Sequence, residues 1–206
     1  MSDYGSAYKK TMGIEGGVNF DPTDRGNVVA SGVVTKPTYK GIAPVSNPKW
    51  PGWEYIDGCI KQLTTMPHYG TGSYYNWAKH LNKCLAEITT LQSMVREFYR
   101  VNYWGQIGRI NDQRIAEATF DRAVNMGVKT AAKLLQRAAG VAVDGDIGKD
   151  TTNTVNGSDP ASLLDAFNAI AKQYYEDIIE RDPSQGQFRK SWFSRLRNYD
   201  DTPFVA

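Results

Sequence analysis

The chain has 206 residues, of which 41% are hydrophobic and 12% aromatic, a composition typical of a globular protein with a sizeable core. Its 24 Lys and Arg against 22 Asp and Glu give a net charge of +2, without the basic surplus typical of nucleic-acid-binding domains. No stretch reaches the roughly 18 apolar residues of a membrane-spanning helix, and the first residues lack the layout of a signal peptide. We therefore expect synthesis inside a cell, no nucleic-acid partner and no stable membrane insertion.

The cysteines and histidines are too few for a disulfide framework or a zinc site. Only Cys59 and Cys84 are present, with His68 and His80 beside them at spacings that match no zinc pattern. We expect no metal ion and no organic cofactor. Whether the two cysteines pair is left open by the sequence.

The N-terminal part is predicted to be rich in loops, because most of the glycines and prolines lie in residues 1–80. Within it, a stripe at helical steps predicts a first short helix. The positions of the stripe are Tyr4, Tyr8, Met12 and Glu15. Two glycines follow Glu15 directly and are expected to end the helix after this carboxylate.

The next segment predicts a hairpin, and the C-terminal part predicts helices. A turn-rich stretch at 21–26 precedes a β-prone run at 28–35. Gly127 and Gly140 are expected to end helices, and Asp159 is expected to cap the N-terminus of one. The helices predicted from apolar periodicity span about 78–103, 115–126, 129–139, 160–182 and 188–199.

A carboxylate on the apolar side of a helix end can act as a general acid. Lost hydration disfavours the charged form of Glu15 and raises its pKa, which keeps the proton available near neutral pH. The alternative from the pattern alone is a helix-terminal glutamate whose carboxylate lies in water. Periodicity leaves both readings open.

Several longer stretches resemble the glycoside hydrolase family 108 muramidases, which are lysozyme-like enzymes found among phage endolysins. Residues 15–33 read EGGVNFDPTDRGNVVASGV and are similar to the opening motif of the family. Residues 98–104 (FYRVNYW) and 120–127 (FDRAVNMG) are similar to a second motif. Residues 135–148 (LQRAAGVAVDGDIG) and 188–195 (FRKSWFSR) resemble the peptidoglycan-binding-like region that follows in these enzymes.

The resemblance implies a mainly α (α+β) fold, lysozyme-like, with a small β-hairpin after the first helix. It implies a catalytic region over residues 1–110 that includes an aromatic-rich insert near 43–93. Residues 111–206 would form a helical peptidoglycan-binding-like region. This second region either packs into one domain with the first or forms a small module.

The resemblance also implies roles for individual residues. Glu15 would be the general acid that protonates the glycosidic oxygen, and Asp24 a second catalytic position. Hydrolysis through an oxocarbenium-like transition state commonly uses two carboxylates, and Asp21 is the other candidate nearby. Asp21, Asn19 and Tyr103 are expected to bind substrate.

The sequence departs from the family pattern after the aspartate. The family usually has a glycine and then a threonine where this chain has Asn27 and Val29. Val29 cannot replace a hydroxyl, because its methyl groups neither donate nor accept hydrogen bonds. We hypothesise that Thr35 supplies the hydroxyl if the hairpin register is shifted, which full activity of Thr35→Val would contradict.

Two other groups of residues have open interpretations. Trp50 and Trp53 open the aromatic-rich insert, and they are candidates for substrate binding in a cleft wall, because aromatic faces suit sugar rings. Equally, these rings could simply pack the loop onto the helices. The basic residues at 189, 190, 195 and 197 are predicted to form a solvated helix face, and contact with anionic wall polymers is the alternative.

The expected function is that of a phage-type endolysin that hydrolyses the β-1,4 bond between N-acetylmuramic acid and N-acetylglucosamine in peptidoglycan. The alternatives are a lytic transglycosylase that uses Glu15 as acid and base, or a peptidoglycan-binding or virion protein without activity. We expect a monomer that is made in the host cytoplasm. It would reach the periplasm or cell wall through holin-type release or on a virion.

Overall fold

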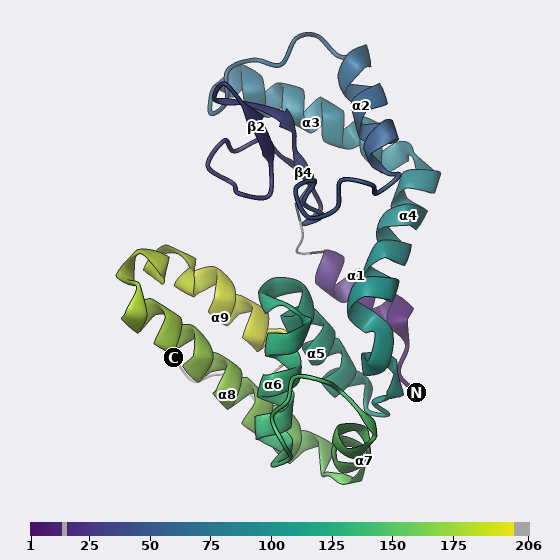
Figure 1. Ribbon diagram of the computed structural model, residues 1–206, viewed down its shortest axis with the longest axis vertical. Coiled ribbons are helices and arrows are strands. Elements are labelled where there is room, and N and C mark those ends of the chain that lie inside the picture. The colour runs from purple at the N-terminus through teal and green to yellow at the C-terminus, as the bar shows by residue number, and fades with distance from the viewer. Residues whose placement is uncertain (14–15, 200–206) are drawn as a thin grey trace. The chain divides into compact units, whose positions relative to one another are not determined.

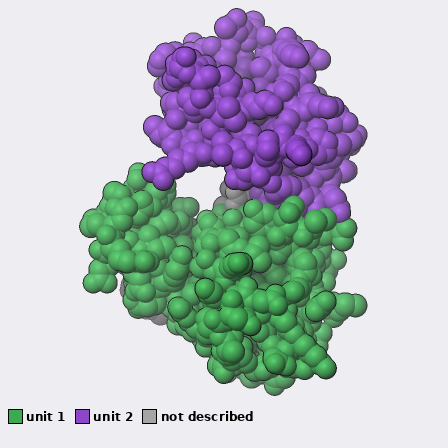
Figure 2. All heavy atoms as spheres, viewed as in Figure 1, with its two compact units in different colours: residues 1–11, 100–206 green, residues 12–99 purple. Residues whose placement is uncertain are grey.

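The computed structural model describes residues 1–13 and 16–199, and it is mainly helical with two small antiparallel sheets, which confirms the predicted fold class. The chain forms two compact units, coloured separately in Figure 2. Unit 1 comprises residues 1–11 and 100–206, and unit 2 comprises residues 12–99. The predicted division into residues 1–110 and 111–206 stays a prediction. No helix in the described part of the chain is both long and apolar enough to cross a membrane.

Unit 2 begins with four short strands. They are β1 (Val18–Asn19), β2 (Val28–Ala30), β3 (Val33–Lys36) and β4 (Thr38–Tyr39). β1 pairs with β4, and β2 pairs with β3, so the hairpin predicted at 28–35 is confirmed. Ser31 and Gly32 connect β2 to β3 with φ of 50° and 77°, the backbone of a tight two-residue hairpin turn.

Three helices complete unit 2 (Figure 1): α2 (Trp53–Gln62), α3 (Gly72–Glu87) and α4 (Thr89–Tyr99). The prediction of one helix over 78–103 is wrong, because the backbone is extended at Ile88, with ψ of 92°. Ile88 begins a run of three β-branched residues, which have low helix propensity. The two helices nevertheless bury apolar residues from that span: Leu81 and Leu85 on α3, and Leu91 and Val95 on α4.

Unit 1 is a helical bundle (Figure 1). Its elements are α1 (Tyr4–Met12), the π-helical turn η1 (Arg100–Trp104), the 3-10 helix η2 (Gly105–Arg109), α5 (Gln113–Met126), α6 (Val128–Ala139), α7 (Lys149–Gly157), α8 (Pro160–Arg181), the 3-10 helix η3 (Pro183–Phe188) and α9 (Arg189–Arg197). α5 is the central helix, because every residue from Ile115 to Ala123 is buried. α6 and α8 both pack against it.

The predicted ends of the C-terminal helices are confirmed. Gly127 and Gly140 end α5 and α6 with φ of 90° and 68°, values that favour glycine. Asp159 caps α8 by accepting a hydrogen bond of 2.9 Å from the amide of Ser162, and Pro160 is the first residue of the helix.

Two α-helices among the described residues were not predicted. α2 follows a segment rich in proline and glycine and contains Gly58, and α7 consists mainly of threonine, asparagine and glycine. Both compositions disfavour helix. Tertiary packing stabilises them instead, since α2 buries Ile56 and α7 buries Val155.

A buried glutamine shapes the loop between α6 and α7. Gln136 is fully buried; its Nε2 donates to Asp144 Oδ1 at 2.6 Å, and its Oε1 accepts from the amide of Gly145 at 2.8 Å. A buried amide needs partners for both its donor and its acceptor, and these bonds hold the loop to α6 at Asp144 and Gly145.

α1 is attached to α5 through one buried carboxylate. Glu117 is 6% exposed and accepts hydrogen bonds from the Ser6 hydroxyl and from Lys10 Nζ, the latter at 3.2 Å. The contacts join residues more than 100 positions apart in the chain. The N-terminal helix is therefore an integral part of unit 1.

The expectation of a solvated basic face on the last helix is wrong for one of its four members. Arg195 is 7% exposed, and its Nη2 lies 2.9 Å from Oδ1 of Asp121 on α5, which is 3% exposed. Arg189, Lys190 and Arg197 are exposed as expected. Arg195 differs because it lies on the inner side of α9 beside the buried Leu196.

The two cysteines lie next to each other on α2 and α3 as free thiols joined by a hydrogen bond. Burial, and to a smaller extent the neighbouring Cys84, raise the pKa of the Cys59 thiol to about 12. Since the thiolate is the reactive form, we expect iodoacetamide at pH 8 to modify Cys84 well before Cys59. Peptide mass spectrometry over a time course measures both rates. Urea-unfolded protein is the control, and equal rates in the native protein would contradict the assignment.

Candidate active site

The predicted acid, Glu15, lies outside the described residues. The structure describes the loop that follows it in unit 2, from Gly16 through β1 to β2. Among the described residues, no group of three or more His, Cys, Asp and Glu side chains could bind a metal ion.

The loop brings Asn19, Asp21 and Asp24 together. Asn19 Nδ2 donates to Asp24 Oδ2 at 2.7 Å, and Asn19 Oδ1 accepts from the amide of Asp21 at 2.9 Å. The second oxygen of Asp24 accepts from the amide of Gly26 at 2.8 Å. Such side-chain to backbone bonds are typical of Asx turns, and they fix the orientation of the Asp24 carboxylate.

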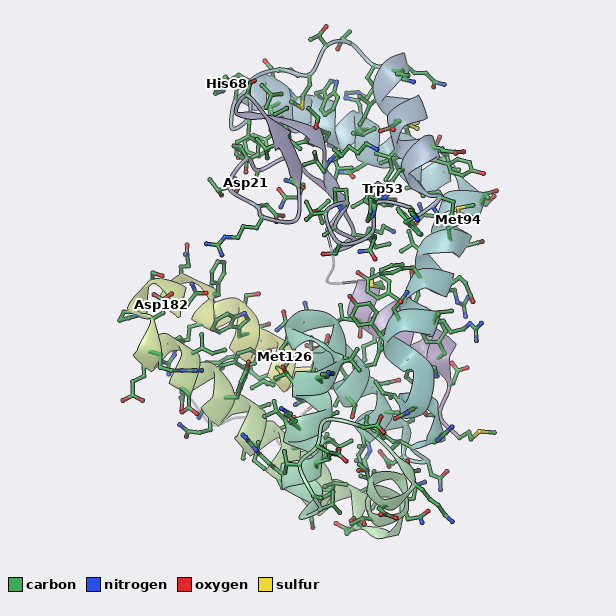
Figure 3. All side chains as sticks on the ribbon, in the orientation of Figure 1. Asp21, Trp53, His68, Met94, Met126 and Asp182 are labelled. Atoms are coloured by element: carbon green, nitrogen blue, oxygen red, sulfur yellow. The ribbon has the colours of Figure 1, made fainter. Side chains whose placement is uncertain are left out.

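Asp21 is stabilised as a carboxylate. Its Oδ1 accepts from the hydroxyl and the amide of Thr23 at 2.7 and 2.8 Å, and these bonds, with one from the Tyr69 side chain, lower its pKa below the ordinary value. Figure 3 places Asp21 on the loop before β2. Asp21 can therefore offer negative charge at neutral pH.

The residues that depart from the family pattern have distinct structural roles. Asn27 is 5% exposed; it donates to the carbonyl of Asp21 at 2.8 Å and accepts from the amide of Thr38 on β4, so it ties the loop to the sheet. Val29 on β2 is 40% exposed. No hydroxyl lies at this position of the strand.

Thr35 lies at an irregularity in the hairpin. Val28 pairs with Lys36 whereas Val29 pairs with Val34, so Thr35 is an extra residue on β3. Its hydroxyl donates to the carbonyl of Val28 at 3.1 Å. The oxygen can still accept a hydrogen bond, and the role of Thr35 in activity stays a hypothesis.

Trp50 and Trp53 lie together near the start of α2. Their rings pack edge to face with centroids 4.9 Å apart, and Trp50 also packs against Phe98. Trp53 is 5% exposed, and its Nε1 donates to the carbonyl of Asn47 at 2.7 Å. In Figure 3, Trp53 and Asp21 lie at different places on the ribbon. These contacts favour the packing interpretation, and substrate binding by the two rings stays a prediction.

Tyr103, the remaining predicted substrate-binding residue, belongs to η1 in unit 1. It lines a cavity of about 220 Å³ together with Gln106 and Asp146, among others. Tyr103 therefore belongs to unit 1, whereas the other candidates of the loop, Asn19, Asp21 and Asp24, belong to unit 2.

Sequence reasoning missed an open pocket in unit 2, which we call the tyrosine hollow. Its volume is about 450 Å³, and it is lined by Val18, Asn19, Tyr69, Tyr74, Tyr75, Ala78, Lys79 and Asn82. The tyrosines belong to the aromatic-rich insert, so composition pointed to the segment. Composition could not distinguish the exposed Tyr75 from the buried Tyr74.

The family is established by the comparisons with known proteins. The model of glycosyl hydrolase 108 matches residues 8–127, which include the loop and the tyrosine hollow. The chain belongs to glycosyl hydrolase family 108. A second model, described as a predicted peptidoglycan domain, matches residues 130–197. The resemblance found in the sequence is confirmed: the chain is a glycoside hydrolase, and it cleaves peptidoglycan.

Solved structures support the fold of this family 108 enzyme. The structure of SagA from Brucella abortus matches with a TM-score of 0.62 and 21% sequence identity, over 95% of this chain and 90% of that chain. At this identity the similarity concerns the fold. No curated protein matches the chain.

Proposed function

We propose that the enzyme hydrolyses the β-1,4 bond between N-acetylmuramic acid and N-acetylglucosamine, with Glu15 as the general acid. The family match carries this proposal, because residues 8–127 contain the whole motif that begins at Glu15. In the proposed reaction Glu15 donates its proton to the leaving glycosidic oxygen, and water adds to the anomeric carbon.

The second carboxylate is assigned to Asp24. The side-chain amide of Asn19 and the backbone amide of Gly26 orient its two oxygens. The carboxylate is therefore already in position and needs no reorganisation during the reaction. Asp21 is proposed to bind substrate, because its pKa is lowered and its carboxylate stays charged beside the hydroxyl of Tyr69. Both negative charges favour an oxocarbenium-like transition state.

A lytic transglycosylase is the second candidate, and Val29 favours it. If the family threonine helps to orient the attacking water, a valine at that position weakens hydrolysis, and the 6-hydroxyl of the sugar can attack instead. The product then carries a 1,6-anhydro ring and is lighter by one water molecule.

Product masses test the proposal. We expect wild-type enzyme and purified peptidoglycan to give soluble muropeptides with reducing muramic ends, detected by mass spectrometry. Borohydride reduction is the control, since only reducing ends gain two hydrogens. Anhydro products would overturn hydrolysis in favour of the transglycosylase, and reducing ends on N-acetylglucosamine would overturn the assigned bond.

The biological setting is proposed from the resemblance to phage endolysins. The enzyme would be made as a monomer in the host cytoplasm and would act at the periplasm or cell wall after holin-type release or on a virion. Size-exclusion chromatography with light scattering tests the monomer. Lysis on expression with and without a holin distinguishes release through a holin from other routes.

A further inference from the structure

We propose that the tyrosine hollow binds an N-acetylhexosamine ring of the glycan against Tyr75, while Lys79 binds a carboxylate carried by the muramyl unit. The carboxylate belongs either to the stem peptide or, where the stem peptide is absent, to the lactyl group. This inference rests on the proposed function and deepens it, because it names the feature by which the enzyme tells peptidoglycan from uncharged glycans.

The aromatic wall has the form of a supported platform. Tyr75 is 62% exposed, whereas Tyr74 behind it is 4% exposed. The Tyr74 ring contacts Tyr75 edge to face at 5.4 Å between centroids and contacts Tyr69 at 4.9 Å. An exposed ring backed by a buried one can stack on the apolar face of a sugar with little loss of side-chain freedom.

The polar lining can recognise an N-acetyl sugar. Asn82 Oδ1 accepts a hydrogen bond from the backbone amide of Val18 at 2.9 Å. This bond orients the side-chain amide of Asn82 and leaves its Nδ2 as a donor for other partners. No acceptor for this Nδ2 lies among residues 1–13 and 16–199. An amide donor beside an aromatic platform suits the carbonyl oxygen of an acetamido group.

The hollow also presents a cation. Lys79 is exposed on α3, and no carboxylate in the described ranges forms an ion pair with it. Peptidoglycan carries carboxylates on its muramyl units, whereas chitin contains only N-acetylglucosamine. A lysine beside the sugar platform therefore adds affinity for the charged glycan alone.

The hollow is linked to the catalytic motif by the chain itself. Val18 follows Glu15 by three residues in the sequence, and three residues of chain span at most about 11 Å. A Cβ atom at Gly17 would lie 2.0 Å from Asn82 Oδ1, so α3 packs directly against the backbone of the motif. A ring in the hollow and the bond to be cleaved can thus belong to one glycan strand.

Binding assays test the proposal with three probes: tetra-N-acetylchitotetraose, soluble glycan strands with stem peptides, and the same strands after amidase treatment. Glu15→Gln protein prevents turnover during calorimetric titration. In this background we expect Lys79→Met to weaken binding of one or both charged strands about fivefold and to leave chitotetraose unchanged. Lys83→Met is the matched control, since Lys83 is exposed on the same helix and does not line the hollow.

The ring is tested in the same way. We expect Tyr75→Ala to weaken all three probes roughly tenfold, and Tyr75→Phe to bind like the parent. For Lys79→Met, weaker binding of the peptide-bearing strands alone assigns the carboxylate to the stem peptide. Weaker binding of the amidase-treated strands alone assigns it to the lactyl group. The proposal would be overturned if Lys79→Met weakened binding of chitotetraose as much as binding of the charged strands. It would also be overturned if Tyr75→Ala left the binding of all three probes unchanged.

These outcomes are separable from the proposed function. If Glu15→Gln cleaves peptidoglycan at the wild-type rate, the assignment of the acid fails. Binding is then measured on probes that resist cleavage, such as chitotetraose and short reduced strands. If Glu15→Gln is inactive and the hollow variants bind normally, only the inference about the hollow fails.

Discussion

Glu15→Gln is expected to reduce the release of soluble muropeptides by roughly 1,000-fold, since general acid catalysis contributes about 10²- to 10⁴-fold. The amide matches the carboxyl group in size but has no acidic proton to give to the leaving oxygen. Initial rates of turbidity loss with purified peptidoglycan, at matched protein concentration, measure the change.

Two further variants show whether this loss is specific. Asp24→Asn removes the charge and keeps one of the two oxygens that accept hydrogen bonds from the loop. We expect a large loss as well, because the second carboxylate then lacks its charge. Thr23→Ala is the control for loop geometry, because it removes the hydroxyl bond to Asp21 and leaves both hydrogen bonds of Asp24 in place. A Glu15→Gln rate within twofold of wild type, with an unchanged circular dichroism spectrum, would rule out Glu15 as the acid.

Asp121→Ala is expected to lower the free energy of unfolding by about 3–5 kcal/mol, the usual result of breaking a buried ion pair. The pair is closely fitted, since Arg195 Nη2 and Nε lie 2.9 and 3.3 Å from the two carboxylate oxygens. Removal of the carboxylate leaves the guanidinium of Arg195 buried without its counter-charge. Urea unfolding followed by circular dichroism measures the difference.

Glu176→Ala is the matched control. Glu176 pairs with Arg189 at 3.4 Å on the surface of unit 1, where an ion pair contributes about 0–1 kcal/mol. The double variant Asp121→Leu with Arg195→Met should recover much of the loss, because it removes both charges of the pair together. If Asp121→Ala is as mild as Glu176→Ala, the pair is not a major source of stability.

Local signals were the parts of the fold that the sequence could predict. The cap at Asp159 and the left-handed glycine at Gly140 each depend on a few neighbouring residues, and so does the hairpin turn at Gly32. The burial of Arg195 depends on Asp121, which lies 74 positions earlier. No periodicity within the last helix could reveal that partner.

In the candidate site, too, residues close in sequence could be predicted and long-range contacts could not. Asn19, Asp21 and Asp24 lie within six residues, so their type and spacing identified them as candidates. The tyrosine hollow depends on the contact of Val18 with Asn82, which are 64 positions apart. The aromatic content of the insert indicated sugar binding but directed attention to Trp50 and Trp53, whose rings pack against each other.

The attachment of α1 to Glu117 has a consequence for the order of events during synthesis. Unit 2 is one continuous segment, residues 12–99, whereas unit 1 joins the first 11 residues to a part of the chain that begins at residue 100. Because domains fold as units while the chain emerges from the ribosome, unit 2 can complete first. α1 must wait for α5, so the N-terminal helix gains its partner only after all of unit 2 and then residues 113–126 have been made.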